Sequence, residues 1–250
     1  MKVFEVVTPG GFLDKSKGYS KDSSALLILL RDAFYEANLA VELYSESNGW
    51  RGNGKDNTLR DDDRKSRERI DAQYKALSSN GCEERQEREF NVERLHKIEQ
   101  WELGRVPTEF RAAKTLIYSK AFVSALDSIG KLIKTLSKED GAPHDLKAIA
   151  EEFYSGIPGL IGLRNSIQHV EDRAIGVFAS KAKRDEESSR FFSSFVGNTY
   201  FATGKECGLD GVNVSLETLE FTLCILNKVM NSYAWVAQKQ HWPSLDPWYR

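Results

Sequence analysis

Cysteine is scarce in this chain, and that scarcity excludes two classes of protein. Only three cysteines occur among the 250 residues, namely Cys82, Cys207 and Cys224. Their odd number and irregular spacing fit neither a disulfide framework nor a zinc site. We therefore expect a protein of a reducing compartment, and we assign it no metal and no cofactor.

Long apolar runs are missing as well. The longest, residues 25–30, is far too short to span a lipid bilayer. Residues 1–9 contain one lysine and no extended apolar core, so they do not resemble a signal peptide. These absences predict a cytoplasmic protein that does not have a membrane as its partner.

The chain also lacks an excess of charge of one sign, because 35 Lys and Arg stand against 37 Asp and Glu. A net charge of −2 provides no general basic field for nucleic acid, so any RNA contact must use a local basic patch. The best local patch comprises Lys181, Lys183, Arg184 and Arg190. It could follow an RNA backbone, and it could equally be a solvated loop.

Several catalytic and ligand-binding motifs are absent. The chain has no nucleotide-binding glycine pattern, no zinc-ligand spacing, no nucleophile elbow and no internal repeat. Asp61, Asp62 and Asp63 could suggest a metal site, but adjacent residues do not share a helix face. Arg60 and Arg64 also flank them. We interpret the aspartates as part of a solvated charged helix or of a flexible insert over the active site.

What is present is helical periodicity. Apolar residues recur every three or four positions in several segments, which is typical of amphipathic helices that bury one face. The helices that this spacing and the capping residues predict cover about 22–46, 108–136, 145–155, 158–176 and 215–233. Before the last helix, β-branched and aromatic residues at 199–202 and 212–214 flank a Gly-rich turn and predict a β-hairpin.

These elements predict an all-α fold, a helical bundle of four or more long helices with that small β-hairpin as an embellishment. Residues 1–250 would form a single helical domain, with a highly charged and helical insert at about 55–105. Ser215 should cap the last helix. His96 lies among the charges of the insert and is expected on the surface, and His241 has no evident partner.

The helix over 108–136 has the clearest pattern. Its predicted inner face comprises Phe110, Ala113, Ile117, Ala121, Ser124, Ile129, Leu132 and Leu136. Asp127 is the one acid near this side of the helix. It could pair with Arg164, it could orient His169 from a neighbouring helix, or it could be an exposed acid.

The segment 163–173 has the most unusual pattern in the chain. Placed on a helix, its apolar stripe comprises Leu160, Leu163, Ile167, Val170 and Ala174. The opposite side is a polar arc of Arg164, Asn165, Gln168, His169 and Asp172, and we count Arg173 as a further supporting residue. Asn165 and His169 are four positions apart, so they stack on one face of the helix.

The polar arc carries a limited and specific chemistry. A histidine can take or give a proton near neutral pH. An arginine stays charged and can hold a phosphate or a developing oxyanion, and an amide can orient the imidazole. Together they suit cleavage of a phosphodiester through attack by the ribose 2′-hydroxyl, without a metal. The other interpretation is a solvated helix face that carries one histidine.

Arg164 and Asn165, followed by three residues and then His169, resemble the R-N-x-x-x-H signature of the HEPN superfamily. The similarity in helix order extends over about 108–235, and it is sharp only at the motif. The resemblance implies an α-helical bundle that dimerises so that two motifs face each other and form one ribonuclease site. It further implies that Arg164 and His169 are catalytic and that Asn165 is auxiliary.

We therefore hypothesise a metal-independent endoribonuclease that acts on RNA as a homodimer, a toxin or a defence effector with an antitoxin or a regulatory protein as a further partner. Asp127, Gln168, Asp172 and Arg173 would support its site. The alternative is a non-catalytic HEPN-like module that binds a nucleotide or a partner protein, which the near-neutral charge favours. A third option is a dimeric scaffold that recruits another protein through its charged segment.

Overall fold

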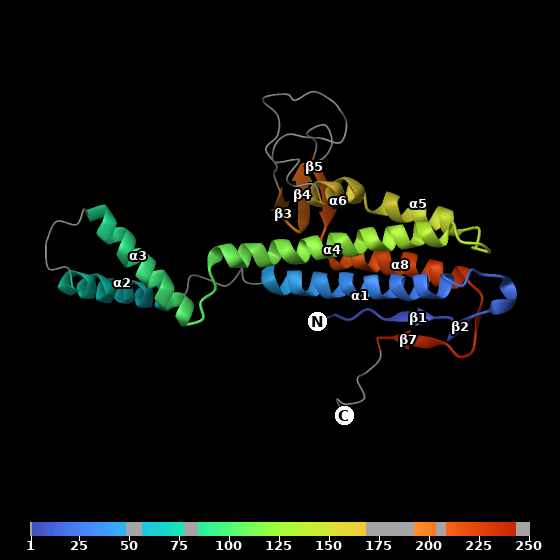
Figure 1. The fold of residues 1–250 in the computed structure, drawn as a ribbon, viewed down its shortest axis with the longest axis horizontal. Coiled ribbons are helices and arrows are strands. Elements are labelled where there is room, and N and C mark those ends of the chain that lie inside the picture. Colours follow the sequence, from blue (N-terminus) through green and yellow to red (C-terminus); the bar gives the residue numbers. More distant parts are fainter. Residues whose placement is uncertain (1, 49–56, 78–84, 169–192, 204–208, 244–250) are drawn as a thin grey trace, which may run out of the picture. The chain divides into compact units, whose positions relative to one another are not determined.

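The computed structural model of the chain is largely helical and contains small antiparallel sheets (Figure 1). It describes residues 2–48, 57–77, 85–168, 193–203 and 209–243. The chain divides into two compact units, residues 1–46 with 116–250 and residues 47–115. None of the helices in the described part combines the length and the apolar character that a membrane crossing requires.

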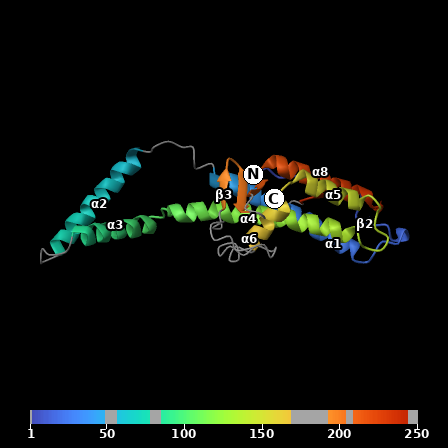
Figure 2. The ribbon, with the colours of Figure 1, turned by 90° about the horizontal axis from the view of Figure 1, so that it is seen from above.

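Besides the short helix α6 (Leu160–Gln168), four helices contribute to the one apolar core of the first unit. These helices are α1 (Ser23–Asn48), α4 (Thr108–Leu136), α5 (Leu146–Gly156) and α8 (Leu216–Ser232). Each supplies a fully buried side chain to the core, namely Phe34, Phe122, Phe153 and Ile225. Figures 1 and 2 show α4 running alongside α1. The apolar stripes that the sequence predicts for α1 and α8 face this core. Their buried members are Leu30, Ala33, Ala37, Val41 and Tyr44 of the first and Leu219, Leu226, Met230 and Tyr233 of the second, and their partly buried members are Leu26, Leu216 and Leu223.

The buried face of α4 differs from the predicted one. The predicted residues that are exposed are Phe110, Ala113, Ile117, Ala121 and Ser124, and Ile117 has 61% of its surface exposed. Of the predicted face, Ile129 and Leu136 are buried and Leu132 is partly buried, and the buried stripe is completed by Phe122, Leu126 and Ile133, which were not predicted. Both stripes have helical spacing, so periodicity alone could not choose between them. The buried one carries the larger side chains, and burial of apolar area stabilises the fold in proportion to that area.

A short helix, α6 (Leu160–Gln168), packs on a three-stranded antiparallel sheet (Figure 1). The strands are β3 (Ser193–Val196), β4 (Thr199–Thr203) and β5 (Leu209–Asn213), in the order β3-β4-β5. The sequence had indicated two strands here and had missed β3. Tyr200, Ala202 and Val212 are buried, so one face of this sheet joins the core of the first unit.

Glycines allow the start of α6 to approach β5 closely. A Cβ atom on Gly159 would lie 2.8 Å from the carbonyl oxygen of Gly211, and Gly159 also has a φ of +85°, which disfavours other residues. A Cβ on Gly162 would lie 2.0 Å from the Asp210 carboxylate. A side chain at Gly159 would meet the backbone of Gly211 and push the helix away from the strand, so this glycine sets how closely α6 approaches β5, whereas at Gly162 the Asp210 side chain would have to move aside.

Two small sheets tie the N-terminal segment to the segment that follows α8. Strand β1 (Val6–Thr8) pairs with β7 (Gln240–Trp242), and β2 (Phe12–Leu13) pairs with β6 (Trp235–Val236), both antiparallel. A 3-10 helix, η1 (Lys15–Lys17), precedes α1. His241, for which the sequence offered no partner, lies with its Nδ1 3.3 Å from a carboxylate oxygen of Glu5. That acid is far away in sequence, and only the pairing of β1 with β7 brings it near.

The second unit contains the charged segment, which forms two helices, α2 (Asn57–Leu77) and α3 (Arg85–Glu102). The two helices pack on each other and are joined by ion pairs, among them Arg67 with Glu93 at 2.8 Å and Arg69 with Glu99. The amide of Asn91 on α3 donates to the hydroxyl of Tyr74 on α2 at 3.0 Å. Polar contacts therefore link two helices that have few apolar side chains to bury.

His96, which the sequence placed on the surface, is buried in this unit with 4% of its surface exposed. The hydroxyl of Ser66 donates to Glu99 at 2.7 Å and lies 3.2 Å from His96 Nδ1. Because a hydroxyl has one proton, its oxygen accepts from a protonated Nδ1. Glu93 and Glu99, its neighbours in the sequence, pair with Arg67 and Arg69 of α2. Asp63 Oδ1 of α2 lies 4.0 Å from His96 Nε2, so the imidazole lies between α2 and α3.

Acidification should loosen the α2–α3 pair. Burial lowers the pKa of His96 from 6.5, and the charge of Arg67 lowers it further, while Asp63, Glu93 and Glu99 oppose the shift. The unfolded segment therefore takes up a proton near 6.5 and the folded one only at lower pH, so the free energy of unfolding falls as pH drops below 6.5. Hydrogen exchange, corrected for intrinsic rates, should show lower protection in α2 and α3 at about pH 5.5 than at about pH 7.5.

His144 provides the matched control for this titration, because it is exposed and belongs to the first unit. His144→Gln should keep the loss of protection in α2 and α3, and His96→Gln should remove most of it. Equal protection at both pH values in the unmodified protein would contradict the assignment of His96.

The N-cap of α8 should contribute measurably to stability. The Ser215 hydroxyl accepts from the backbone N–H of Thr218 at 3.3 Å, which satisfies a donor that the helix itself cannot. Ser215→Ala should lower the free energy of unfolding by about 1 kcal/mol in urea titrations. Ser128→Ala should have little effect, since that hydroxyl only bonds back to the Ser124 carbonyl inside α4. Equal stabilities of the two variants would refute the cap.

Candidate functional site

Helix α6, called the motif helix because it carries Arg164 and Asn165, ends at Gln168, the last described residue of this segment. The described residues of its predicted apolar stripe face the core. Leu160 and Leu163 are buried in the core and Ile167 is half-buried against it. Leu163 donates its N–H to the carbonyl of Gly159 at 2.8 Å, which closes the first turn of α6. Val170 and Ala174 lie outside the described residues. The stripe fixes the rotation of α6 and so turns Arg164 away from the deepest part of the core.

Arg164 is held in place by two side chains. Its Nε donates to Asp127 Oδ1 at 3.2 Å, and its Nη1 donates to Gln168 Oε1 at 3.0 Å. The Arg164 side chain keeps 23% of its surface exposed, whereas that of Asp127 keeps only 6%. The pair with Arg164 is therefore present and Asp127 is not an exposed acid, while His169, which the remaining option involves, lies outside the described residues. The guanidinium is oriented by the buried carboxylate of Asp127 on α4 and by the amide of Gln168, one turn further along α6.

Asp127 accepts from two cations, one at each oxygen. Its Oδ2 lies 2.7 Å from Lys131 Nζ, one turn further along α4, while its Oδ1 takes Arg164. A buried carboxylate needs such partners, because an unpaired charge in the interior is costly. The cluster of two cations and one anion has an excess positive charge at the exposed end of the group.

A tyrosine completes the cluster from α5. Burial raises the pKa of Tyr154, the Asp127 carboxylate raises it further, and Arg164 opposes this shift. Its ring lies against Lys134, whose Nζ is 3.9 Å from the ring centroid. A Cβ on Gly130 would lie 2.5 Å from the Tyr154 hydroxyl oxygen, so that glycine makes room for the phenol on α4. Tyr154 therefore stays protonated at neutral pH and can act as a hydrogen-bond donor.

Two members of this cluster were missed by sequence reasoning. Lys131 could have been found, because it stands four positions after Asp127, the spacing at which helical ion pairs form. Tyr154 gave no such signal, since only the packing of α5 on α4 brings it near Asp127. Asn165, the predicted auxiliary residue, is half-buried beside Arg164 on α6.

The remaining predicted site residues lie outside the described residues, and this includes the predicted catalytic histidine. They are His169, Asp172, Arg173, Lys181, Lys183, Arg184 and Arg190. His169 is the next residue of the chain after Gln168, the last described residue of α6.

The described cluster has the chemistry of an anion site. Arg164 and Lys131 offer cationic donors, and Tyr154 offers a neutral donor. Among the described residues, no group of three or more His, Cys, Asp or Glu is arranged to hold a metal ion. Asp63, one of the adjacent aspartates, pairs with Arg105 instead. The arrangement suits recognition of a phosphate or a carboxylate through hydrogen bonds.

Comparison with known proteins adds no family to this geometry. No protein-family model, no curated protein and no solved structure matches the chain. The function must therefore be argued from the motif, the contacts of Arg164 and the chemistry that they permit.

The Arg164–Asp127 pair should be energetically coupled. In urea titrations of the variants Arg164→Gln and Asp127→Asn and of the double variant, we expect a coupling energy of about 1 to 2 kcal/mol, because the carboxylate is buried. A matched double-mutant cycle measures the coupling between Asp127 and Lys131, whose side chain is 54% exposed. Its coupling to Asp127 should stay below about 0.5 kcal/mol. Equal couplings in the two cycles would show that Arg164 is merely a surface partner.

Proposed function

We propose that this chain is a metal-independent endoribonuclease of the HEPN type. Arg164 is the first residue of the motif that ends at His169. The observation that carries the proposal is that the buried carboxylate of Asp127 on α4 holds this arginine in place. Because an unpaired buried carboxylate is costly, Asp127 holds Arg164 in place, and this fixes the position of the guanidinium. The anchored guanidinium is pre-organised to receive a phosphate.

Each residue of the motif has a defined part in the proposed reaction. The ribose 2′-hydroxyl attacks the adjacent phosphorus and loses its proton, and the 5′-oxygen leaves and gains a proton. His169 transfers one of these protons as general acid or base. Arg164 stabilises the charge that develops on the phosphate oxygens, and Asn165 orients the site. The products are a 2′,3′-cyclic phosphate and a 5′-hydroxyl, and the balance of the reaction requires no metal and no cofactor.

The reaction requires two proton transfers, and one histidine per chain is too few for both. We therefore propose a homodimer in which the motif helices of two helical bundles face each other and form a composite site. Lys181, Lys183, Arg184 and Arg190 follow the motif in sequence and would track the RNA backbone. A nuclease of this kind would serve as a toxin or a defence effector in the cytoplasm, restrained by an antitoxin or another regulatory protein.

One observation favours a second function. The Nε and Nη1 groups of Arg164 already donate to Asp127 and Gln168, which leaves fewer donors for a substrate phosphate. With a net charge of −2, the chain also has little general attraction for RNA. The alternative is therefore a non-catalytic HEPN-like module that binds a nucleotide or a partner protein through the same anion site.

Incubation with a mixture of structured and unstructured RNAs, in excess chelator, tests the nuclease. The unmodified protein should cleave RNA and leave cyclic phosphate ends, which are detected by their resistance to ligation until the phosphate is removed. His169→Ala should abolish cleavage, and Arg164→Ala should reduce it by about a hundredfold or more, the loss expected for one donor to a developing oxyanion.

His241→Ala is the matched control, because His241 is exposed and lies far from the motif in sequence. This variant should cleave as the unmodified protein does, and the inactivity of His169→Ala prepared in the same way excludes a contaminating ribonuclease. Full activity of His169→Ala would overturn the proposal. Absence of cleavage, together with nucleotide binding that Arg164→Ala weakens, would select the binding module.

A further inference from the structure

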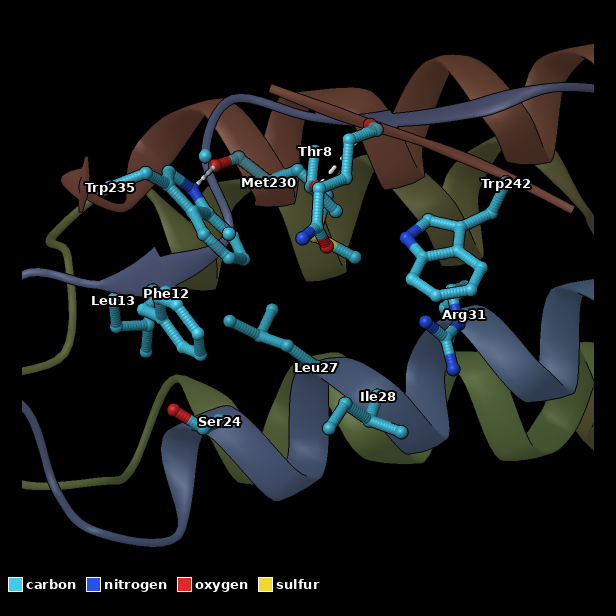
Figure 3. A pocket seen from close by; sticks show the side chains of 13 residues that line it. Thr8, Phe12, Leu13, Ser24, Leu27, Ile28, Arg31, Met230, Trp235 and Trp242 are labelled. Atoms are coloured by element: carbon cyan, nitrogen blue, oxygen red, sulfur yellow. Dashed lines mark hydrogen bonds between the residues drawn. The ribbon is translucent and has the colours of Figure 1, made fainter. Parts of the chain in front are cut away.

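A cavity of about 330 Å³ lies in the first unit, away from the motif helix (Figure 3). Its walls come from α1, from the β1–β2 segment and from the segment that runs from the end of α8 through β6 and β7. The side chains that matter for its chemistry are Phe12, Leu27, Ile28, Arg31, Trp235 and Trp242. The volume is near the lower end of the range for small-molecule sites, so the cavity fits one small ligand.

Most of the lining is apolar and rigid. Leu27 is buried on the α1 side, and Met230 faces the cavity from α8. Trp235 uses its Nε1–H to donate to the carbonyl of Met230 at 2.7 Å, so its polar atom is satisfied and its ring serves as a wall. Phe12 and Ile28 keep 69% and 50% of their surface exposed, which indicates an open rim beside this interior.

The charged group of the cavity is the guanidinium of Arg31. It lies over the indole of Trp242, with its central carbon 4.4 Å from the ring centroid, and Figure 3 shows both at the end of the cavity away from Trp235. The side chain is only 18% exposed, and its Nε and Nη2 donate to Asp32 Oδ1 at 3.0 and 2.9 Å. Stacking fixes the plane of the guanidinium, and its remaining N–H donors have defined directions.

The partner of Arg31 is weakly held. Asp32 is the next residue on the same helix and its side chain is 50% exposed, so the pair is a surface ion pair of small net stability. A second carboxylate that arrives over the Trp242 end can share the guanidinium or displace Asp32. Such exchange is disfavoured for Arg164, whose acid is buried.

We propose that this cavity binds a small planar aromatic carboxylate of one or two rings. The ring system would lie between Leu27, Ile28 and Trp235, and its carboxylate would pair with Arg31 at the Trp242 end. The aromatic and aliphatic walls favour a flat apolar body, and the single oriented guanidinium favours one anionic group. This site is separate from the motif, so it stands whether or not the chain cleaves RNA.

Isothermal titration with two isosteric probes tests the proposal on the full chain. 2-Naphthoate carries a carboxylate, and 2-naphthamide has the same rings with a neutral amide. We expect naphthoate to bind with one site per chain and at least about tenfold more tightly than naphthamide. Bound naphthoate should also raise the midpoint of thermal unfolding, because the cavity is formed only in the folded state, where the N-terminal segment and the segment after α8 lie together.

Variants of Arg31 and Asp32, the ion pair on α1, distinguish an ionic from a purely apolar contribution to binding. Arg31→Gln should weaken naphthoate by about tenfold and leave naphthamide nearly unchanged. Asp32→Asn should strengthen naphthoate several-fold, because it removes the competing carboxylate. Opposite effects of two neighbouring changes cannot arise from a general loss of stability.

A pair of tryptophan substitutions tests the location. Ile28→Trp should fill the rim of the cavity and abolish binding of both probes. Leu29→Trp is the matched control, since Leu29 is 53% exposed on the same helix and does not line the cavity. The proposal is overturned by no binding of naphthoate at millimolar concentration, by equal binding of the two probes, or by undiminished binding to a folded Ile28→Trp variant.

Discussion

The described structure of the first unit depends on the burial of one stripe of α4, from Phe122 to Leu136, in the shared core. This stripe fixes the rotation of the helix about its axis, and Asp127 stands within it, next to the fully buried Leu126. The support of Arg164 is therefore a consequence of core packing, as are the positions of Lys131 and Tyr154.

The motif helix depends on a second constraint, the close approach of α6 to β5. Gly159 and Gly162 permit this approach, and the buried Leu160 and Leu163 hold it. Together they place Arg164 over Asp127 from a separate helix. Residues from α4 and α6 thus meet in one ion-paired group, and Tyr154 of α5 lies near enough for the Asp127 charge to raise the pKa of its phenol.

Two arginine–aspartate pairs in the unit illustrate how burial decides the use of a charge. Asp127 is buried, so separating it from Arg164 would leave an isolated charge in the interior. Asp32 is half-exposed, so water can replace Arg31 as its partner at small cost. The first pair is suited to orient a group permanently. The second is suited to exchange partners with an incoming anion, which is why the two sites support different proposals.

The sequence by itself determined the positions of the main helices, the capping of α8 by Ser215 and the inner faces of α1 and α8. These features depend on neighbours within a few residues, which the order of residues specifies directly. It also brought forward Arg164, and it offered the pair with Asp127 as one option among three. The predicted roles of these residues and of His169 stay predictions.

Only the tertiary structure decided which residues of α4 are buried, that His96 is buried, and that Tyr154 packs against Gly130 and Lys134 of α4. Each of these depends on which distant segment supplies the other half of a contact. Two stripes of α4 have the same spacing, and a histidine among charges looks the same whether or not a second helix covers it. Periodicity specifies that a face is apolar, and the free energy gained with a particular partner selects the face that is used.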